Sequence, residues 1–303
     1  MKRFSNFPLF KWIAAHRRVL GVIIIVLSLA FLVWYTASHP QIIKSVIHTS
    51  PLVLLALLVL YLANVGVVFF VNFFTVRICG KELGVRQGIF LTIYSTVINF
   101  FGPLQSGPGV RAVYLKTKIG LRIRDYTLAT LFYYFAFGAI NASLLFISSW
   151  WWLSILGFAL SIVLIVIGTK KLHFSHRALD IWAIYLVSFI QVAITTSIYF
   201  TELHTTGTNA SLLHTIVYTA SANLSLFVSL TPGGIGIREA FIVFTQSLHH
   251  ISTASILSAG ILDRAFYVLF LVLLFLGSSA FHVRDAVVGK SQKESANELE
   301  EHA

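Results

Sequence analysis

The length of its apolar runs constrains the fold of this chain more than any other feature. Six runs are each long enough for a helix to cross a membrane. They cover residues 19–37, 51–76, 126–147, 152–168, 178–200 and 252–281. Only 11% of all residues are charged, whereas a soluble domain has about a quarter. The runs therefore predict an all-α polytopic membrane protein with six full spans.

Two further apolar segments are interrupted by proline and glycine. Residues 88–101 are too short for a span and lead into GPLQSGPGVRAVYLK, and residues 212–230 lead into TPGGIGIREAF. The connections 77–86 and 111–124 are basic, so the positive-inside rule places both in the cytoplasm. That placement requires the segment between them to enter and leave the membrane on one side. We therefore expect two re-entrant helical hairpins in addition to the six spans.

This topology divides the chain into two halves of opposite orientation. Residues 19–147 and 152–282 each read as two spans, a hairpin and a third span, a pattern typical of inverted-topology repeats. We expect a single integral membrane domain over residues 1–285 and a disordered cytoplasmic tail over residues 286–303. Both termini then lie in the cytoplasm, and the protein is expected in the cell (inner) membrane.

The tips of the hairpins are the expected binding site. Broken helices persist inside a membrane where protein or water satisfies the freed backbone groups, so such breaks mark cavities. The N-terminus of a half-helix carries a partial positive charge and attracts phosphate or carboxylate. The predicted tip residues are Pro108, Gly109, Pro232, Gly233, Gly234 and Gly236.

Charged and amide residues near the tips are candidates for substrate contact. Arg111 and Arg238 follow the two breaks, and Asp263–Arg264 lies inside the last apolar run, where charges are rare and usually paired. The predicted substrate-binding residues are Asn99, Arg111, Asn223, Arg238, Glu239, Asp263 and Arg264.

Structural roles remain open for the same residues. Arg238 can pair with the adjacent Glu239, and Asp263 can pair with Arg264 or with Arg238. Arg111 can belong to the cytoplasmic cluster that includes two neighbouring lysines. The two asparagines, each nine residues before a Pro-Gly pair, can cap freed backbone groups.

Several other functions are disfavoured by composition and motifs. The net charge of +11 comes from short clusters between apolar runs, with no aromatic-interleaved basic surface, so nucleic-acid binding is not expected. The single cysteine, Cys79, excludes a disulfide within the chain. His249–His250 lacks a third ligand at helical spacing, so no metal is expected. No nucleotide-binding or catalytic motif is present, and we expect no cofactor and no catalytic residue.

Two stretches carry a family resemblance. NLSLFVSLTPGGIGIREAF and NFFGPLQSGPGVRAVYLKTKIG resemble the hallmarks of the lysylphosphatidylglycerol synthase/flippase transmembrane family. The resemblance covers roughly residues 10 to 285. The first hallmark departs from the family at SGPGVR, where members often have further glycines and an acidic residue before the arginine.

The resemblance implies a function in lipid handling. In the best-known members the membrane domain is fused to a cytoplasmic aminoacyl-transferase domain and is taken to move the aminoacylated lipid across the bilayer. This chain leaves no room for that domain, so we expect a stand-alone member. Some stand-alone members are linked to polyisoprenyl-phosphate sugar pathways, and handling of a lipid phosphate is the shared element.

The leading hypothesis is a flippase-like translocase for an anionic or aminoacylated phospholipid or a polyisoprenyl-phosphate lipid. Its head group would be held near the membrane midplane between the two Pro-Gly hairpins. One alternative is a membrane transferase with a polyisoprenyl-phosphate donor, for which Glu239 and Asp263 are the candidate bases. Another is a secondary transporter of a small anion. A separate lipid-modifying synthase is a possible partner.

Overall fold

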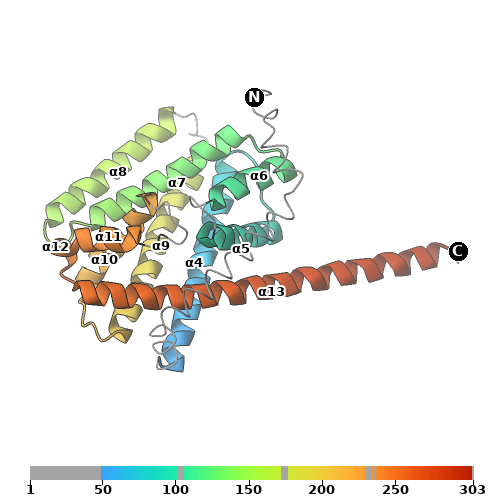
Figure 1. The fold of residues 1–303 in the computed structure, drawn as a ribbon. Helices are drawn as coiled ribbons and strands as arrows, with labels where there is room; N and C mark the ends of the chain where they lie inside the picture. The colour runs from blue at the N-terminus through green and yellow to red at the C-terminus, as the bar shows by residue number, and fades with distance from the viewer. Residues whose placement is uncertain (1–48, 102–105, 172–176, 229–233, 235, 302–303) are drawn as a thin grey trace, which may run out of the picture.

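The chain folds into helices throughout the part that the structure describes. The structure is a computed structural model describing residues 49–101, 106–171, 177–228, 234 and 236–301 (Figure 1). The α-helices are α4 (Pro51–Ile78), α5 (Val85–Phe101), α6 (Gly107–Ile119), α7 (Ile123–Leu144), α8 (Trp151–Lys171), α9 (Ala178–Thr205), α10 (Leu212–Ser225), α11 (Ile237–Phe244), α12 (Gln246–His249) and α13 (Thr253–Glu301). A 3-10 turn, η3 (Leu226–Val228), follows α10.

Five of these helices are long and apolar enough to cross a membrane. They are α4, α7, α8, α9 and the Thr253–Ser279 part of α13. Each coincides with a run that the sequence predicts as a span, so five of the six predicted spans have a helical counterpart. The sixth, residues 19–37, lies outside the described residues. The protein is therefore a multi-pass membrane protein.

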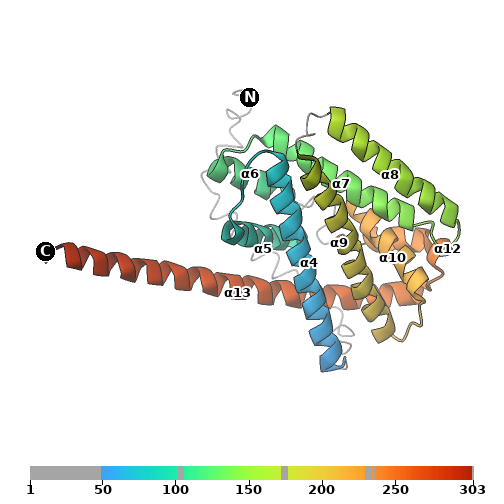
Figure 2. The ribbon, with the colours of Figure 1, turned by 180° about the vertical axis from the view of Figure 1, so that it is seen from behind.

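The long helices pack around α4 and α9. These two helices lie side by side along much of their length (Figure 2), and α7 and α13 both contact them. Tyr61 of α4, Ile198 of α9 and Leu262 of α13 belong to one buried cluster. Nearer the start of α9, Ala136 of α7 and Ile184 of α9 share a second cluster with Ile165 of α8. These clusters fix the helices that surround the candidate site.

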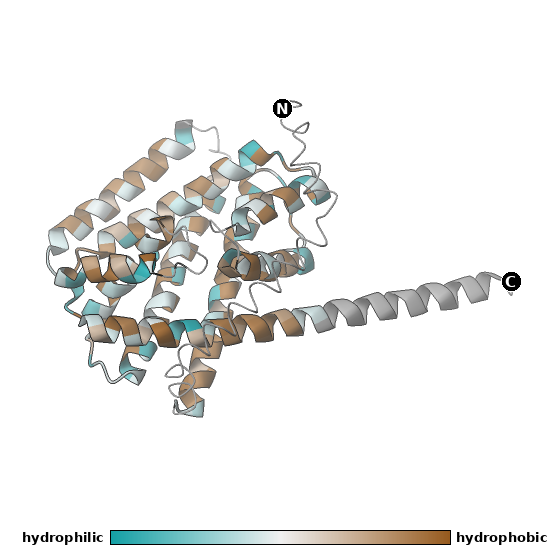
Figure 3. Ribbon diagram, in the orientation of Figure 1, coloured by the Kyte–Doolittle hydropathy of each residue, from teal (hydrophilic) through white to brown (hydrophobic). Residues whose placement is uncertain are grey.

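Large apolar side chains also cover the outside of the bundle. Helix α8 lies at the periphery and packs on α7 (Figure 1), and its residues Ile155, Leu156 and Leu160 are exposed. Brown segments of high hydropathy recur along the outer helices in Figure 3. Such surface is unfavourable in water but suits contact with lipid.

The two interrupted segments form two pairs of shorter helices. Helix α5 packs against α6, and α10 packs against α11. The interruption separates Phe101 from Gly107 in the first pair and Val228 from Ile237 in the second. The entry of these pairs into the membrane from one side, and the inverted-repeat relation between the halves, stay predictions.

Two boundaries differ from the sequence-based expectation. Helix α9 continues to Thr205, whereas the sequence suggested a connection from residue 201. Glu202 is therefore a helical residue, and its side chain is fully buried. Helix α13 continues to Glu301 through the segment expected to be a disordered tail. Residues 286–301 include four glutamates, two lysines and two alanines, which have high helix propensity.

Candidate functional site

A cavity of about 770 Å³ lies between the two interrupted pairs and the central helices. Side chains from α4, α5, α6, α7, α9, α10, α11 and α13 line it. Its size falls in the range of about 300–1,000 Å³ that is usual for ligand sites. Segments far apart in the sequence therefore meet at one cavity.

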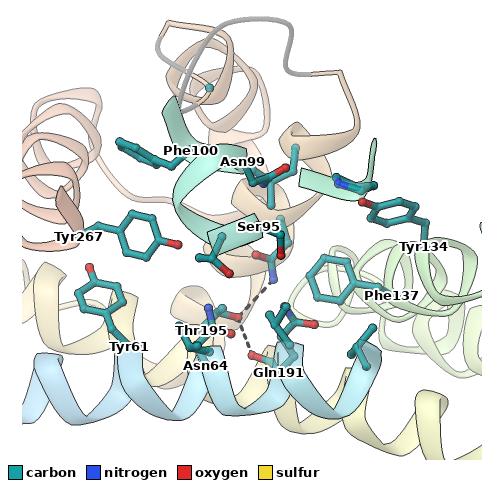
Figure 4. A pocket seen from close by; sticks show the side chains of 18 of the residues that line it. Tyr61, Asn64, Ser95, Asn99, Phe100, Tyr134, Phe137, Gln191, Thr195 and Tyr267 are labelled. Atoms are coloured by element: carbon teal, nitrogen blue, oxygen red, sulfur yellow. Dashed lines mark hydrogen bonds between the residues drawn. The ribbon is translucent and has the colours of Figure 1, made fainter. Parts of the chain in front are cut away.

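Aromatic, amide and hydroxyl side chains line the cavity (Figure 4). Tyr61 and Tyr267 lie near each other at one end, and Tyr134 and Phe137 lie at the other. Amide and hydroxyl groups occupy the region between these ends; they belong to Asn64, Ser95, Asn99, Gln191 and Thr195. The lining thus offers apolar surface together with neutral hydrogen-bonding groups.

The first interrupted pair brings the N-terminus of α6 to the cavity. The amide of Gly107 donates to Oδ1 of Asn99 at 3.2 Å, which joins α5 to α6 across the break. A Cβ atom on Gly107 would lie 2.8 Å from the Ser95 carbonyl oxygen, so only glycine allows this approach. Pro108 and Gly109 follow and line the cavity. Asn99 therefore takes the capping role that the sequence left open, and it also lines the cavity.

Arg111 reaches the same cavity from the next turn of α6. Its Nη1 donates to Oδ1 of Asn72 at 2.9 Å, and Asn72 in turn donates to Thr92 at 2.9 Å. Its Nε is buried without a hydrogen-bonding partner among the described residues. Arg111 thus lines the cavity and is held by a neutral amide.

The second interrupted pair brings α11 to the cavity. Gly234 lines it and has a φ of 68°, a left-handed conformation that favours glycine. Arg238, in the first turn of α11, is 8% exposed, and its Nη1 donates to Oδ2 of Asp263 at 2.5 Å. Its guanidinium carbon lies 5.3 Å from the centre of the Tyr199 ring. Pro232 and Gly233 lie outside the described residues.

The guanidinium of Arg238 keeps unused donors. Its Nε and Nη2 are buried, and neither has a partner in the part of the chain that the structure describes. A buried donor without a partner costs free energy. Arg238 also lines the cavity, so a ligand placed there can accept from these groups once the guanidinium turns toward it.

Glu239 and Arg264 pair with each other beside the cavity lining. Nη2 of Arg264 donates to Oε1 of Glu239 at 2.6 Å. The other carboxylate oxygen of Glu239 accepts from the amide of Gly236 at 2.8 Å and so caps α11. Neither Glu239, Arg264 nor Gly236 is among the residues that line the cavity. The ion pairs are therefore crossed between α11 and α13, and the adjacent pairing of Arg238 with Glu239 does not occur.

Asn223 lines the cavity from the end of α10. Its Nδ2 lies 2.9 Å from Oδ1 of Asn141 and 3.3 Å from Oγ1 of Thr195. Asn141 belongs to α7 and Thr195 to α9. This amide therefore ties three helices together at the cavity wall, a role that the sequence did not reveal for Asn141.

Tyr61 and Glu202 form a buried polar group that the sequence-based prediction missed. Oη of Tyr61 lies 2.7 Å from Oε1 of Glu202 and 3.0 Å from Oδ1 of Asp263. Glu202 was assigned to a connection because the apolar run ends at Phe200. In the structure α9 continues through residues 201–205, which places Glu202 inside the helix bundle.

The chemistry of the lining favours an anion. Its charged residues are Arg111, Arg238 and Asp263, which leaves one positive charge in excess. The N-terminal turns of α6 and α11 add partial positive charge at the same place. Within the described ranges, no three His, Cys, Asp or Glu residues are placed to hold a metal ion.

Cys79 offers no nucleophile to the site. It follows α4 and does not line the cavity. Burial, with a smaller effect from Asp125, raises the pKa of its thiol to about 12. The thiol is therefore protonated at neutral pH and unreactive.

Comparison with known families supports the resemblance in the two Pro-Gly stretches. The family model described as "Lysylphosphatidylglycerol synthase TM region" matches residues 18–274. The match contains both interrupted pairs and every described residue that lines the cavity. None of the curated proteins compared with the chain matches it.

Proposed function

The chain belongs to the lysylphosphatidylglycerol synthase TM region family, and from this premise we propose that it translocates a lipid with an anionic phosphate group. The substrate class is an anionic or aminoacylated phospholipid or a polyisoprenyl-phosphate lipid. The phosphate binds in the cavity between the two interrupted pairs, with Arg111 and Arg238 as its charged contacts.

This proposal rests mainly on the burial and the unused hydrogen-bond donors of Arg238. A buried guanidinium with two unused donors, Nε and Nη2, lines a cavity of suitable size. Phosphate oxygens satisfy such donors well, because the planar fork of arginine matches their spacing. Arg111 adds a second guanidinium with an unused Nε.

The remaining lining suits the rest of a lipid. Val68, Phe100 and Phe137 supply apolar surface for the first part of the acyl or prenyl chains. The rest of the chains stays in the bilayer. The interrupted pairs act as gates that open the cavity alternately to the two sides, with both termini of the chain in the cytoplasm.

Translocation is favoured over transfer chemistry by the placement of the carboxylates. Glu239, one of the two candidate bases, pairs with Arg264 beside the lining. Asp263, the other, pairs with Arg238. An ion-paired carboxylate is a weak base, since its partner stabilises the charged form.

The test is a transport assay in proteoliposomes that contain the full chain. Fluorescent phosphatidylglycerol is placed in both leaflets, and its movement is followed by chemical quenching from outside. Wild type and Lys118→Gln are expected to move the lipid, and Arg111→Gln is expected to lose most of the activity. Both residues lie on α6 and lose the same charge, but Lys118 is exposed and does not line the cavity.

Two results would contradict the proposal. One is a wild-type rate equal to that of protein-free vesicles for phosphatidylglycerol, an aminoacylated phosphatidylglycerol and a polyisoprenyl phosphate. The other is equal activity in Arg111→Gln and wild type. A competition arm with dimethyl phosphate separates a lipid site from a small-anion site, because a free phosphodiester should inhibit only weakly if the lipid chains contribute to binding.

A further inference from the structure

The buried carboxyl groups beside Arg238 point to a second function of the site. Glu202 of α9 is 0% exposed, and its Oε2 has no hydrogen-bonding partner in the described part of the chain. Its partner Tyr61 belongs to the apolar cluster of α4, α9 and α13 that also contains Ile198 and Leu262. An ionised carboxylate left unpaired in such a place costs far more free energy than a neutral acid.

The hydroxyl of Tyr61 allows the protons to be counted. It stands 2.7 Å from one carboxyl oxygen of Glu202 and 3.0 Å from one of Asp263. A tyrosine hydroxyl has a single hydrogen to donate and can also accept. The carboxyl group that does not receive this hydrogen must itself carry one to be attracted at that distance.

The arginine decides which carboxyl group is protonated. The other oxygen of Asp263 accepts from Arg238 at 2.5 Å, so Asp263 is the ionised member. The extra proton therefore lies on Glu202, which donates to Tyr61, while Tyr61 donates to Asp263. In this state the group of Glu202, Tyr61, Asp263 and Arg238 has no net charge.

Binding of an anion changes this balance. A phosphate that accepts from Arg238 shares the single positive charge of the guanidinium with Asp263, so one of the two buried negative charges is no longer compensated. We propose that Glu202, Tyr61 and Asp263 form a proton-binding site that takes up one proton when an anion binds to Arg238. This inference rests on the proposed function, because it requires an anion at Arg238.

The proton has a defined route. A hydronium ion in the cavity, which Tyr61 and Asp263 both line, gives its proton to Asp263 and leaves as water. Tyr61 and Glu202 end with as many protons as they had, and Asp263 gains one. The anion and the proton then enter the cavity together, so the loaded site carries no more charge than the empty one.

Among the ionisable side chains gathered here, only the carboxyl groups of Glu202 and Asp263 can gain or lose a proton near neutral pH. The other side chains acting on them are Arg238 of α11, Tyr199 of α9, Tyr218 of α10 and Tyr267 of α13, together with Tyr61 of α4. Tyrosine and arginine keep their protons at neutral pH. Glu239 faces the same group and is neutralised by Arg264.

The experiment measures protons taken up during binding by the full chain in detergent. Dihexanoylphosphatidylglycerol is the probe, since its phosphodiester does not titrate near neutral pH. Calorimetry in two buffers of different ionisation enthalpy gives the number of protons per lipid. Wild type is expected to take up one proton per lipid. In the pH range where a full proton is taken up, its affinity for the lipid is expected to fall about tenfold for each unit by which the pH rises.

Two matched variants locate the proton. Asp263→Asn is expected to bind the lipid with no proton uptake and no pH dependence, because the amide cannot be protonated. Asp180→Asn removes a second buried aspartate that pairs with an arginine, Arg77, outside the cavity, and it should keep the uptake. Infrared spectroscopy of wild type should show a protonated carboxyl band that is absent from Glu202→Gln, and a second such band after lipid binding.

The outcomes separate this inference from the proposed function. Lipid binding without proton uptake in wild type would overturn the inference and leave the proposed function in place. Binding that depends on sodium instead of pH would overturn it as well. A wild-type spectrum without the Glu202 band at neutral pH would contradict the proton count itself. Absence of lipid binding at every pH would overturn both proposals.

Discussion

The two interrupted pairs hold their arginines in different ways. Arg111 of α6 is only partly buried and is held by the neutral amide of Asn72. Arg238 of α11 is buried and is paired with the carboxylate of Asp263. The first arginine therefore offers its whole charge to a ligand. The second offers its full charge only after Asp263 has been neutralised. Arg111 therefore attracts the anion, whereas Arg238 couples anion binding to protonation of Asp263.

The largest effect on stability is expected for Arg238→Gln. Removing the arginine leaves Asp263 buried without a positive partner, and breaking a buried pair in this way costs about 3–5 kcal/mol. Denaturation in detergent should show this loss, and Asp263→Asn in the same chain should restore most of it. If Arg238→Gln alone were as stable as wild type, the Arg238–Asp263 pair would contribute no more to stability than the Arg111–Asn72 contact.

A glycine substitution tests the first pair. In Gly107→Ala the new Cβ would lie 2.8 Å from both Asn99 and the Ser95 carbonyl oxygen, and such overpacking costs about 1–3 kcal/mol. Gly109→Ala is the control, because a Cβ there meets no atom within 4 Å. Equal unfolding free energies in the two variants would show that α5 and α6 do not approach as closely as described.

The sequence predicts the long elements well and the pairing of charges poorly. Spans such as α4 and α8 follow from uninterrupted apolar length, which depends on nothing outside the segment. The partners of Arg238 and Glu239 depend on how α11 lies on α13, and residues adjacent in sequence point to different sides of a helix. Arg238 therefore pairs with Asp263, and Glu239 pairs with Arg264.

Glu202 shows a second limit of the sequence. Its neighbours after Phe200 are polar enough to suggest a connection, yet packing against α4 and α13 keeps the last turn of α9 helical and buries the carboxyl group. In contrast, Asn99, Arg111 and Asn223 could be selected because proline and glycine mark the breaks beside them. Local breaks are visible in a sequence, whereas contacts between distant helices are not.

An intermediate effect is expected for Arg111→Gln on lipid affinity. A hydrogen bond with a charged partner contributes about 1.5–3 kcal/mol, so the affinity for dihexanoylphosphatidylglycerol should fall at least tenfold. Folding stability should fall less than in Arg238→Gln, since only the neutral Oδ1 of Asn72 loses its donor and Asn72 keeps its bond with Thr92. Calorimetry at one pH measures the affinity, and Lys118→Gln serves as the control. A loss of stability as large as that of Arg238→Gln would remove the difference between the two arginines.

The smallest effect concerns the pH dependence of stability near α12. Burial lowers the pKa of His249 below its ordinary value, and the nearby His250 and His214 act in the same direction, against the bond to Ile242. The neutral ring accepts from the Ile251 amide through Nδ1, which leaves Nε2 to donate to the Ile242 carbonyl.

The sign of this effect follows from the lowered pKa. As pH falls below about 6.5, the unfolded chain binds a proton at His249 before the folded chain does. Stability is therefore lost as pH falls through the folded pKa. Denaturation at several pH values should show a flatter profile for His249→Gln than for wild type. Equal profiles for the two proteins would contradict this expectation.

The most direct test of the anion site is a cryo-electron microscopy map of the full chain with saturating dihexanoylphosphatidylglycerol. The account predicts density for the phosphate between α6 and α11, within hydrogen-bonding distance of Nε or Nη2 of Arg238 and of Arg111. A map with lipid bound elsewhere on the bundle, and with this cavity empty, would contradict it.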